Sequence, residues 1–327
     1  MDDLIILYDT NEFLDWFLQL LEDKYGEPRV QRNTSVDYLN VSITRLNSST
    51  NQFPEGTFLV SQQGYLETLK NKYPDYFWTD DSVKVPYTTE LFSDGDVSPA
   101  SDPKMFVSVV MSLVYVCTRA RPDIFLAISY LCTKVKNPTA EDETKLRRLC
   151  AYLQNTITLV LAFTPSTDLN IVSWVDASYA IHDDAKGHSG TLITVGCVKG
   201  SPVFIRSRKQ KLVTRSSTES ELVAMHDASP QVVWTKGFLE ELGHAQRPAV
   251  IMQDNKSTIF MAEKGSGNFH RTKHIAVRYF AIKQLIEEET VQLQYSPTET
   301  MLADPLTKPV IGKRFVEWRD QILFSPQ

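Results

Sequence analysis

The chain has 327 residues, enough for two or three domains, and an ordinary globular composition of 42% hydrophobic and 23% charged residues. No apolar run approaches the roughly eighteen residues of a membrane span, and the N-terminal MDDLIIL lacks the basic region of a secretory signal. The net charge of −6 argues against nonspecific coating of nucleic acid by the whole surface.

The first hundred residues predict a small mixed segment that ends in a linker. A strand is expected over Asp2–Asp9, and an amphipathic helix over Asn11–Tyr25. Tyr38–Arg45 alternates like a strand, and Ser61–Tyr73 has the spacing of a second amphipathic helix. Trp78–Pro103 is acidic and rich in proline, which predicts a linker.

The next segment predicts a helical region. Helices are expected over Pro103–Arg119, Pro122–Val135 and Pro138–Leu153. Proline suits the first turn of a helix, where its missing N–H is not needed. Acidic residues near the starts of the second and third helices suit the helix dipole.

From Ile171 onward, strands come first and then alternate with helices. The expected strands span residues 171–176, 189–198, 202–206, 249–253 and 291–295. The expected helices start near Ser217, near Ser257, at 274 (ending at 288) and near Thr298. Three adjacent strands followed by helix–strand alternation predict a mixed sheet with flanking helices, so the fold class is α/β.

Four acidic residues end strand-like runs or lie on apolar helical faces, where an unpaired carboxylate is expensive. They are Asp176, Glu221, Asp254 and Asp304. Asp176 and Asp254 fall at two strand ends, where ligand groups gather in such sheets. Carboxylate-rich sites suit Mg²⁺ or Mn²⁺, and two such ions can activate a water and stabilise the leaving oxygen of a phosphodiester. The four acids therefore predict a two-metal nuclease site.

Several long segments resemble the ribonuclease H domain of copia-type retrotransposon polyproteins. They are SRKQKLVTRSSTESELVAM, VVWTKGFLEELG, DNKSTIFMAEK, HRTKHIAVRYFAIKQLIEEE and SPTETMLADPLTKP. Upstream, CTRARPDIFLAISYLCTKVKNPT resembles the connecting region before that domain, and MDDLIIL resembles the catalytic turn of reverse transcriptase. The resemblance implies a truncated reverse transcriptase palm and thumb with a linker over 1–100, a helical connection over 101–165, and a ribonuclease H-like mixed five-stranded sheet with flanking helices over 166–327.

The four acids match the family's metal-binding acids, with Asp176 expected to bridge two Mg²⁺ ions (or Mn²⁺), Glu221 and Asp254 on one side and Asp304 on the other. Glu219 is the rival of Glu221, but residues two apart on a helix point in different directions, so only one should face the metals. The implied activity is an endonuclease that cuts the RNA strand of RNA–DNA hybrids.

The chain departs from the wider pattern in two places. Ala177 stands where a glycine often follows the first aspartate, and the loop that carries a catalytic-site histidine in many ribonucleases H is absent. Asp2 and Asp3 match the paired aspartates of reverse transcriptase, but the third polymerase carboxylate and the fingers do not precede them. We therefore expect a polymerase remnant without polymerase activity.

Hybrid recognition is expected through phosphates and the 2′-hydroxyl rather than base edges. The candidates for these contacts are Ser178, Arg208, Lys209, Asn255, Arg271 and Lys273. The basic stretches Ile205–Arg215 and His270–Lys283 contain four of them, although a charge run is equally compatible with a solvated face. Further partners would be other products of the polyprotein, and no membrane is expected. The resemblance implies work in the cytoplasm, in virus-like particles, with products that reach the nucleus.

Three other interpretations stay open. Each acid alone could be structural, with Asp176 in a turn, Asp254 opening an Asx turn and Asp304 capping a helix. The chain could be a decayed or co-opted retroelement fragment that binds nucleic acid or a partner without cutting. A transposase or integrase core would share the sheet and the carboxylates, but the ADPLTK ending disfavours it.

The four cysteines, Cys117, Cys132, Cys150 and Cys197, lack metal-like spacing and predict buried thiols in a reducing compartment.

Overall fold

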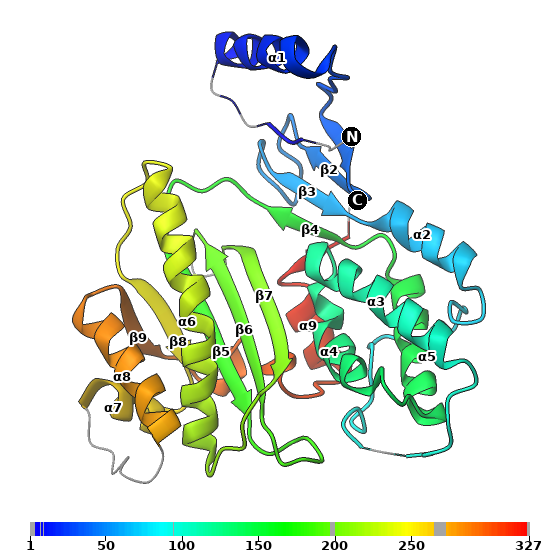
Figure 1. Ribbon diagram of the computed structural model, residues 1–327, viewed down its shortest axis with the longest axis vertical. Coiled ribbons are helices and arrows are strands. Elements are labelled where there is room, and N and C mark those ends of the chain that lie inside the picture. The colour runs from blue at the N-terminus through cyan, green and yellow to red at the C-terminus, as the bar shows by residue number, and fades with distance from the viewer. Residues whose placement is uncertain are drawn as a thin grey trace.

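The computed structural model describes residues 4–6, 8, 10–93, 95–196, 200–264 and 273–325. Within these residues the strands form two five-stranded sheets, which helices surround and connect (Figure 1). Asp2, Asp3 and Cys197 lie outside the described residues. No helix in the described part of the chain is both long and apolar enough to span a membrane.

The first sheet is antiparallel throughout and joins distant parts of the chain. Its strands, in the order in which they pair, are β1 (Ser35–Tyr38), β2 (Val41–Arg45), β3 (Phe58–Ser61), β4 (Val160–Phe163) and β10 (Leu323–Phe324). Helices α1 (Asn11–Tyr25) and α2 (Gln63–Lys72) accompany it, near the sequence predictions. The sequence did not predict β3, β4 or β10.

Two predictions for the N-terminal segment are wrong. The expected strand over Asp2–Asp9 is not formed by its described residues 4–6 and 8, because Leu4 and Ile5 are exposed and pair with no strand. The single strand expected over Tyr38–Arg45 is the second half of a hairpin. Leu39 and Asn40 both have positive φ, as a two-residue turn between antiparallel strands requires.

The second sheet is mixed and confirms the ribonuclease H-like architecture. Its strands, in pairing order, are β7 (Ser201–Lys209), β6 (His188–Val195), β5 (Ile171–Ser178), β8 (Ala249–Gln253) and β9 (Val291–Tyr295). The pairs among β7, β6 and β5 are antiparallel, whereas β5 with β8 and β8 with β9 are parallel. Parallel β5 and β8 end at the same edge of the sheet, which brings their last residues together.

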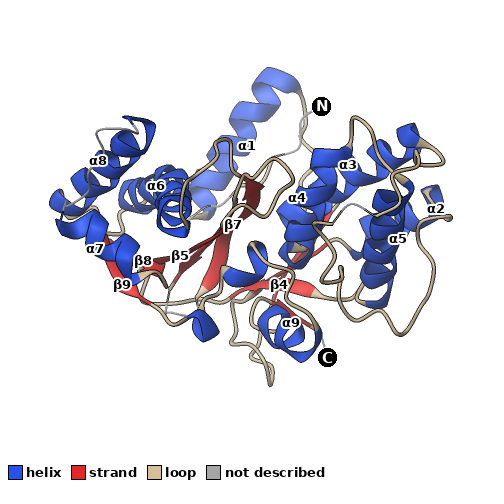
Figure 2. Cartoon of the chain, turned by 90° about the horizontal axis from the view of Figure 1, so that it is seen from below, coloured by secondary structure: helices blue, strands red, loops and turns tan. Residues whose placement is uncertain are grey.

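Helices cover both faces of this second sheet (Figure 2). One face packs against α6 (Ser217–Glu241), α7 (Lys256–Lys264) and α8 (Lys273–Glu287). The other face contacts α4 (Phe125–Lys134) and the C-terminal segment, and α3 (Pro103–Arg119), η1 (Pro122–Ile124) and α5 (Ala140–Asn155) extend the same core beyond α4. Alternate residues of β5 serve the two cores: Val175 points to the α6 side, and Val172 and Trp174 to the α3–α5 side.

The C-terminal segment is not the continuous helix expected from about Thr298. It consists of two short 3₁₀ turns, η3 (Thr298–Thr300) and η4 (Asp304–Leu306), followed by α9 (Gly312–Arg319). Pro305 and Pro309 supply no backbone N–H, so a longer α-helix cannot form across them.

The segment Trp78–Pro103 lacks regular structure but is not an exposed linker. Its side chains Val83, Val85, Tyr87 and Leu91 are buried in the same core as α3 to α5. The segment therefore packs into the molecule, and the division of the chain into three domains stays a prediction.

A buried ionic network holds the turn before α4. Arg121, which is 1% exposed, forms a 2.7 Å ion pair with Asp123 and donates to the backbone carbonyl of Thr156 at the end of α5. The Tyr152 hydroxyl donates to the same aspartate. Arg121, Asp123 and Tyr152 therefore all have partners, as a buried charge pair must to avoid a large penalty. Nearby, Cys117 and Cys150 are buried free thiols, as expected, whereas Cys132 is a free thiol that is only partly buried.

Candidate metal-dependent active site

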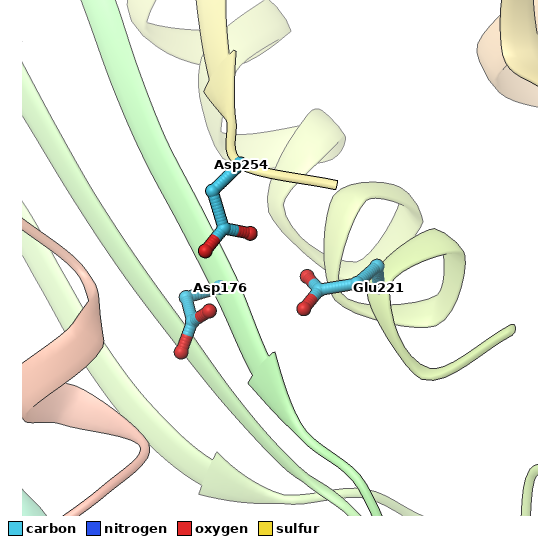
Figure 3. A group of neighbouring side chains, drawn as sticks. All are labelled: Asp176, Glu221 and Asp254. Atoms are coloured by element: carbon cyan, nitrogen blue, oxygen red, sulfur yellow. The ribbon is translucent and has the colours of Figure 1, made fainter. Parts of the chain in front are cut away.

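Three of the four predicted acids converge at the edge of the second sheet. Asp176 belongs to β5, Asp254 directly follows β8, and Glu221 lies in the second turn of α6. Each contributes a carboxylate oxygen, and these atoms all lie within 4.8 Å of one another. Figure 3 shows the three side chains pointing toward a common space. The parallel pairing of β5 with β8 therefore brings together residues that are far apart in sequence.

Glu221 and Glu219, the two candidates for the second acid, have different roles in the structure. Glu219 lies in the first turn of α6, where its carboxylate accepts the backbone N–H of Arg215 at 2.8 Å. The backbone N–H of Glu219 donates to the side chain of Ser216, the N-cap of the helix. Glu219 therefore stabilises the start of the helix, while Glu221 enters the cluster.

The cluster is electrostatically unfavourable without a cation. Burial raises the pKa of Asp176, an effect that Lys308 and Thr307 oppose and that Asp304 and Asp254 reinforce. Burial, followed by the charges of Asp176 and Asp254, raises the pKa of Glu221 well above its usual value. Carboxyl groups that share a dry site disfavour one another's ionisation.

One carboxylate oxygen of the cluster has no partner that offsets its burial. Asp176 is 1% exposed, and its Oδ1 has no hydrogen-bond partner among the described residues. A buried, unpaired carboxylate oxygen is costly unless a cation neutralises it. The donor set, which is all oxygen and all acidic, fits a hard divalent ion such as Mg²⁺ or Mn²⁺.

Neighbouring polar groups orient two of the carboxylates. The Gln253 amide donates to Glu221 Oε2 at 3.3 Å, and the Thr298 hydroxyl donates to Asp254 Oδ2 at 2.8 Å. Gln253 is completely buried, and its amide oxygen accepts the backbone N–H of Asn255. Such outer contacts fix the direction of metal ligands.

Asp304 is close to the cluster but is not one of the three converging acids. It is buried on η4, where its Oδ1 lies 2.6 Å from Lys308 Nζ and its Oδ2 lies 3.2 Å from the Arg314 guanidinium. The same ammonium lies 3.5 Å from Asp176 Oδ2. Asp304 is thus linked to Asp176 of the cluster through the ammonium of Lys308.

A glycine allows η4 to approach the sheet. Gly190 of β6 is the cross-strand partner of Asp176, and a Cβ there would lie 2.8 Å from side-chain atoms of Leu306 and Thr307. The close approach lets the Thr307 hydroxyl donate a hydrogen bond to Asp176 Oδ2. Neither residue was predicted to belong to the site, although Thr307 follows Asp304 within the ADPLTK motif.

A pair of buried histidines, which was not predicted as part of the site, supports η4 through Ser207. His182 Nε2 and His188 Nδ1 are 3.0 Å apart, and His188 Nε2 lies 2.7 Å from Ser207 Oγ. Ser207 donates in turn to the carbonyl of Leu306. Burial lowers the pKa of both imidazoles, that of His182 to about 4, so both are neutral at physiological pH. Two histidines six residues apart were a visible signal, but their partner Ser207 comes from another strand.

The residues predicted to contact nucleic acid differ in their burial and in their partners within the protein. Ser178 is buried and its hydroxyl donates to the carbonyl of Thr307, so this hydroxyl has a partner within the protein, and its contact with nucleic acid stays a prediction. Asn255 accepts the Thr258 N–H at the start of α7 and so has a capping role. Lys209 forms a 2.9 Å ion pair with Asp184. Arg208 lines a small cleft near Asp227 of α6, two strands from β5. Arg271 and the side chain of Lys273 lie outside the described residues.

Comparisons with known proteins show that the chain is similar to retrotransposon Pol polyproteins. The chain is 32% identical over 98% of its length to the retrovirus-related Pol polyprotein from transposon RE1 of Arabidopsis thaliana, covering 21% of that protein. It is 33% identical over 64% of its length to the corresponding polyprotein from transposon TNT 1-94 of Nicotiana tabacum, covering 16% of it. Among solved structures, a foamy viral protease-reverse transcriptase in complex with an RNA/DNA hybrid matches 88% of this chain and 38% of that chain, at 12% identity and a TM-score of 0.45. No protein-family model matches the chain.

The strand order and the carboxylate cluster define a ribonuclease H-like α/β protein. With the polyprotein relatives, they show that this chain belongs to the Pol polyproteins of copia-type retrotransposons. It spans about a fifth of the length of the curated relatives that it matches.

Proposed function

We propose that this chain is a metal-dependent ribonuclease H that cuts the RNA strand of RNA–DNA hybrids. The observation that carries the proposal is the convergence of Asp176, Glu221 and Asp254 around an unpaired, buried carboxylate oxygen. A cluster of this kind at the edge of a ribonuclease H-like sheet, in a Pol relative, supports phosphodiester hydrolysis over a purely structural role.

Each residue has a distinct part in this proposal. Asp176, Glu221 and Asp254 would hold the divalent ion, and Asp304 would complete a site for a second one. When bound, two such ions supply an activated water and charge stabilisation at the leaving oxygen. Gln253 and Thr298 keep the carboxylates oriented, and Thr307 holds the outer oxygen of Asp176.

The partner in this proposal is the hybrid itself, contacted through its phosphates and 2′-hydroxyls. Arg208 and Lys209 on the edge strand β7, with Arg271 and Lys273 near the start of α8, remain the candidates. Other products of the polyprotein would be further partners. We place this activity in the cytoplasm, where the transcript and its DNA copy meet in virus-like particles. The expected lack of polymerase activity stays a prediction.

The decisive experiment is cleavage of an end-labelled RNA–DNA hybrid in Mg²⁺ or Mn²⁺. The Asp254→Asn variant should lose cleavage by about a thousandfold or more while keeping its fold, because it removes a ligand charge without changing shape. Glu221→Gln should fall comparably, and the matched control Glu219→Gln should stay near the wild-type rate. Wild-type cleavage by Asp254→Asn would show that the site is misassigned.

One observation favours the alternative of a co-opted fragment that binds without cutting. The helix α1 exposes aromatic side chains, including Phe13, Trp16 and Tyr25, and buries only Leu14. Such a surface suits contact with another protein. Folded wild-type protein that binds the hybrid but leaves it intact in both metals would favour this second function.

A further inference from the structure

A lysine stands between two acids of the candidate site. The Nζ of Lys308 lies 2.6 Å from Asp304 Oδ1 and 3.5 Å from Asp176 Oδ2. The carboxylate side chains of Asp176 and Asp304 are only 1% and 4% exposed, whereas Lys308 is 42% exposed. The ammonium thus enters a buried acidic space from the solvent side.

The local backbone dictates this position. The backbone N–H of Lys308 donates to the carbonyl of Asp304, which closes one helical turn after Pro305. Residues four apart on such a turn share a side, so the ammonium falls onto the Asp304 carboxylate. Thr307, one residue earlier, reaches Asp176 from the same turn.

The charges divide the four acids into two groups. Asp304 is already compensated, by Lys308 on one oxygen and Arg314 on the other. The converging acids Asp176, Glu221 and Asp254 retain an unpaired buried oxygen. A divalent ion arriving at the three-acid cluster meets one cation, 3.5 Å from Asp176 Oδ2, whereas one arriving at Asp304 meets two cations at 2.6 Å and 3.2 Å.

We propose that Lys308 is a built-in cation of the site, which competes with a divalent ion for the space between Asp176 and Asp304. The first ion binds to Asp176, Glu221 and Asp254 without displacing the lysine. An ion that uses Asp304 binds only after the ammonium withdraws from the two carboxylates. A lysine suits this role, because its charge sits on a long flexible stem that can move into water. The inference rests on the proposed function, since it assumes that divalent ions bind here.

Metal titration tests the proposal without relying on cleavage. Metal-free protein would be titrated with Mn²⁺ alone and followed by calorimetry and by the electron paramagnetic resonance signal of free Mn²⁺. The wild type should show one stronger and one weaker binding step. In Lys308→Met the weaker step should tighten by about tenfold or more, because the competing charge is gone. Lys308→Arg should keep the weak step, and Lys313→Met should match the wild type, since Lys313 is exposed and pairs with Glu317.

Thermal unfolding gives a second readout for the same variants. Without metal, Lys308→Met should unfold at a lower temperature than the wild type, because two buried carboxylates lose their counter-charge. Mn²⁺ should restore more of its stability than it adds to the wild type. If Lys308→Met fails to fold, Lys308→Gln replaces it.

The outcomes separate the two proposals. Isotherms of Lys308→Met and wild type that coincide, both with ions bound, would overturn the role of the lysine and leave the metal site standing. Weaker Mn²⁺ binding in Lys308→Met would also overturn it, since a competitor cannot assist its rival. A wild type that binds no Mn²⁺, with or without hybrid, would refute the proposed metal-dependent function itself.

Discussion

Both faces of the ribonuclease H-like sheet pack against apolar cores, but only the face under η4 adds a set of directional polar contacts. On β6, Ile193 points to α6 and is completely buried among apolar side chains. Three residues earlier, Gly190 points to the opposite face, where η4 packs against it. A few residues of one strand therefore take part in two different kinds of interface.

The α6 face is stabilised by apolar burial. Val175 and Ile193 pack against Leu222, Val223 and Met225, all of them nearly or completely inaccessible to solvent. Burial of this kind contributes about 25 cal/mol for each Å² of apolar surface and needs no particular geometry.

Where η4 packs, the opposite face adds directional polar contacts to an apolar core that includes Val172, Trp174 and Leu306. Asp176 and Ser178 bind the hydroxyl and the carbonyl of Thr307, and Ser207 binds the carbonyl of Leu306. It also carries an unpaired carboxylate oxygen and a lysine between two acids. The comparison teaches that the sheet can tolerate a costly polar cluster under η4 because apolar cores on both of its faces supply the stability.

The strongest test of this difference between the two faces is a substitution that leaves a cavity in the core on the α6 face. Ile193→Ala removes buried methyl groups and should lower the free energy of unfolding by about 2–5 kcal/mol. Cleavage per folded molecule should stay within about twofold of the wild type, because no contact of η4 is changed. Urea unfolding and hybrid cleavage at low temperature measure the two effects. A large loss of cleavage in folded Ile193→Ala would mean that the faces are not independent.

The opposite face should respond to an added methyl group. In Gly190→Ala the new Cβ would meet Leu306, Thr307 and the carbonyl of Ala303 at 2.8–2.9 Å, so η4 must shift. We expect a loss of about 1–3 kcal/mol in unfolding free energy. Cleavage should fall by more than this loss explains, because Thr307 and Lys308 move away from Asp176.

A matched substitution controls for the general effect of replacing glycine. Gly237 lies in α6 with no atom within 4 Å of an added Cβ. Gly237→Ala should therefore be neutral or stabilising by up to about 1 kcal/mol, since alanine favours helices. Equal effects of the two substitutions on cleavage would rule out a special role for the approach of η4.

The sequence was sufficient wherever local periodicity decides the structure. Asn11–Tyr25, Pro103–Arg119 and the parallel strands β8 and β9 occur where they were predicted. The positions of two carboxylates of the cluster could therefore be predicted, because the ends of β5 and β8 define where Asp176 and Asp254 lie. The mixed character of the second sheet followed in the same way from its strand and helix pattern, whereas its strand order is seen only in the structure.

Structure that depends on distant partners was not predictable. The strands β4 and β10 are short apolar segments without periodicity, and they are strands because β4 pairs with both β3 and β10. Ser178 looked available beside an acid, yet it is buried by a turn 129 residues away. The salt bridges of Asp304 depend on a turn that Pro305 and Pro309 shape, where the sequence predicted a helix.

The smallest predicted effect concerns pH and again distinguishes the two faces. Burial holds the pKa of His188 well below its usual value, whereas the unfolded chain takes up a proton near pH 6.5. Below that pH the unfolded state binds more protons, so the unfolding free energy falls by up to about 1.4 kcal/mol per pH unit for this imidazole. His188→Gln should therefore show a shallower loss of stability between pH 6.5 and 5 than the wild type, as measured by urea unfolding. Ile193→Ala should keep the wild-type slope at a lower absolute stability, because the α6 face contains neither imidazole. Parallel slopes for His188→Gln and wild type would mean that the buried histidine pair does not couple the η4 face to pH.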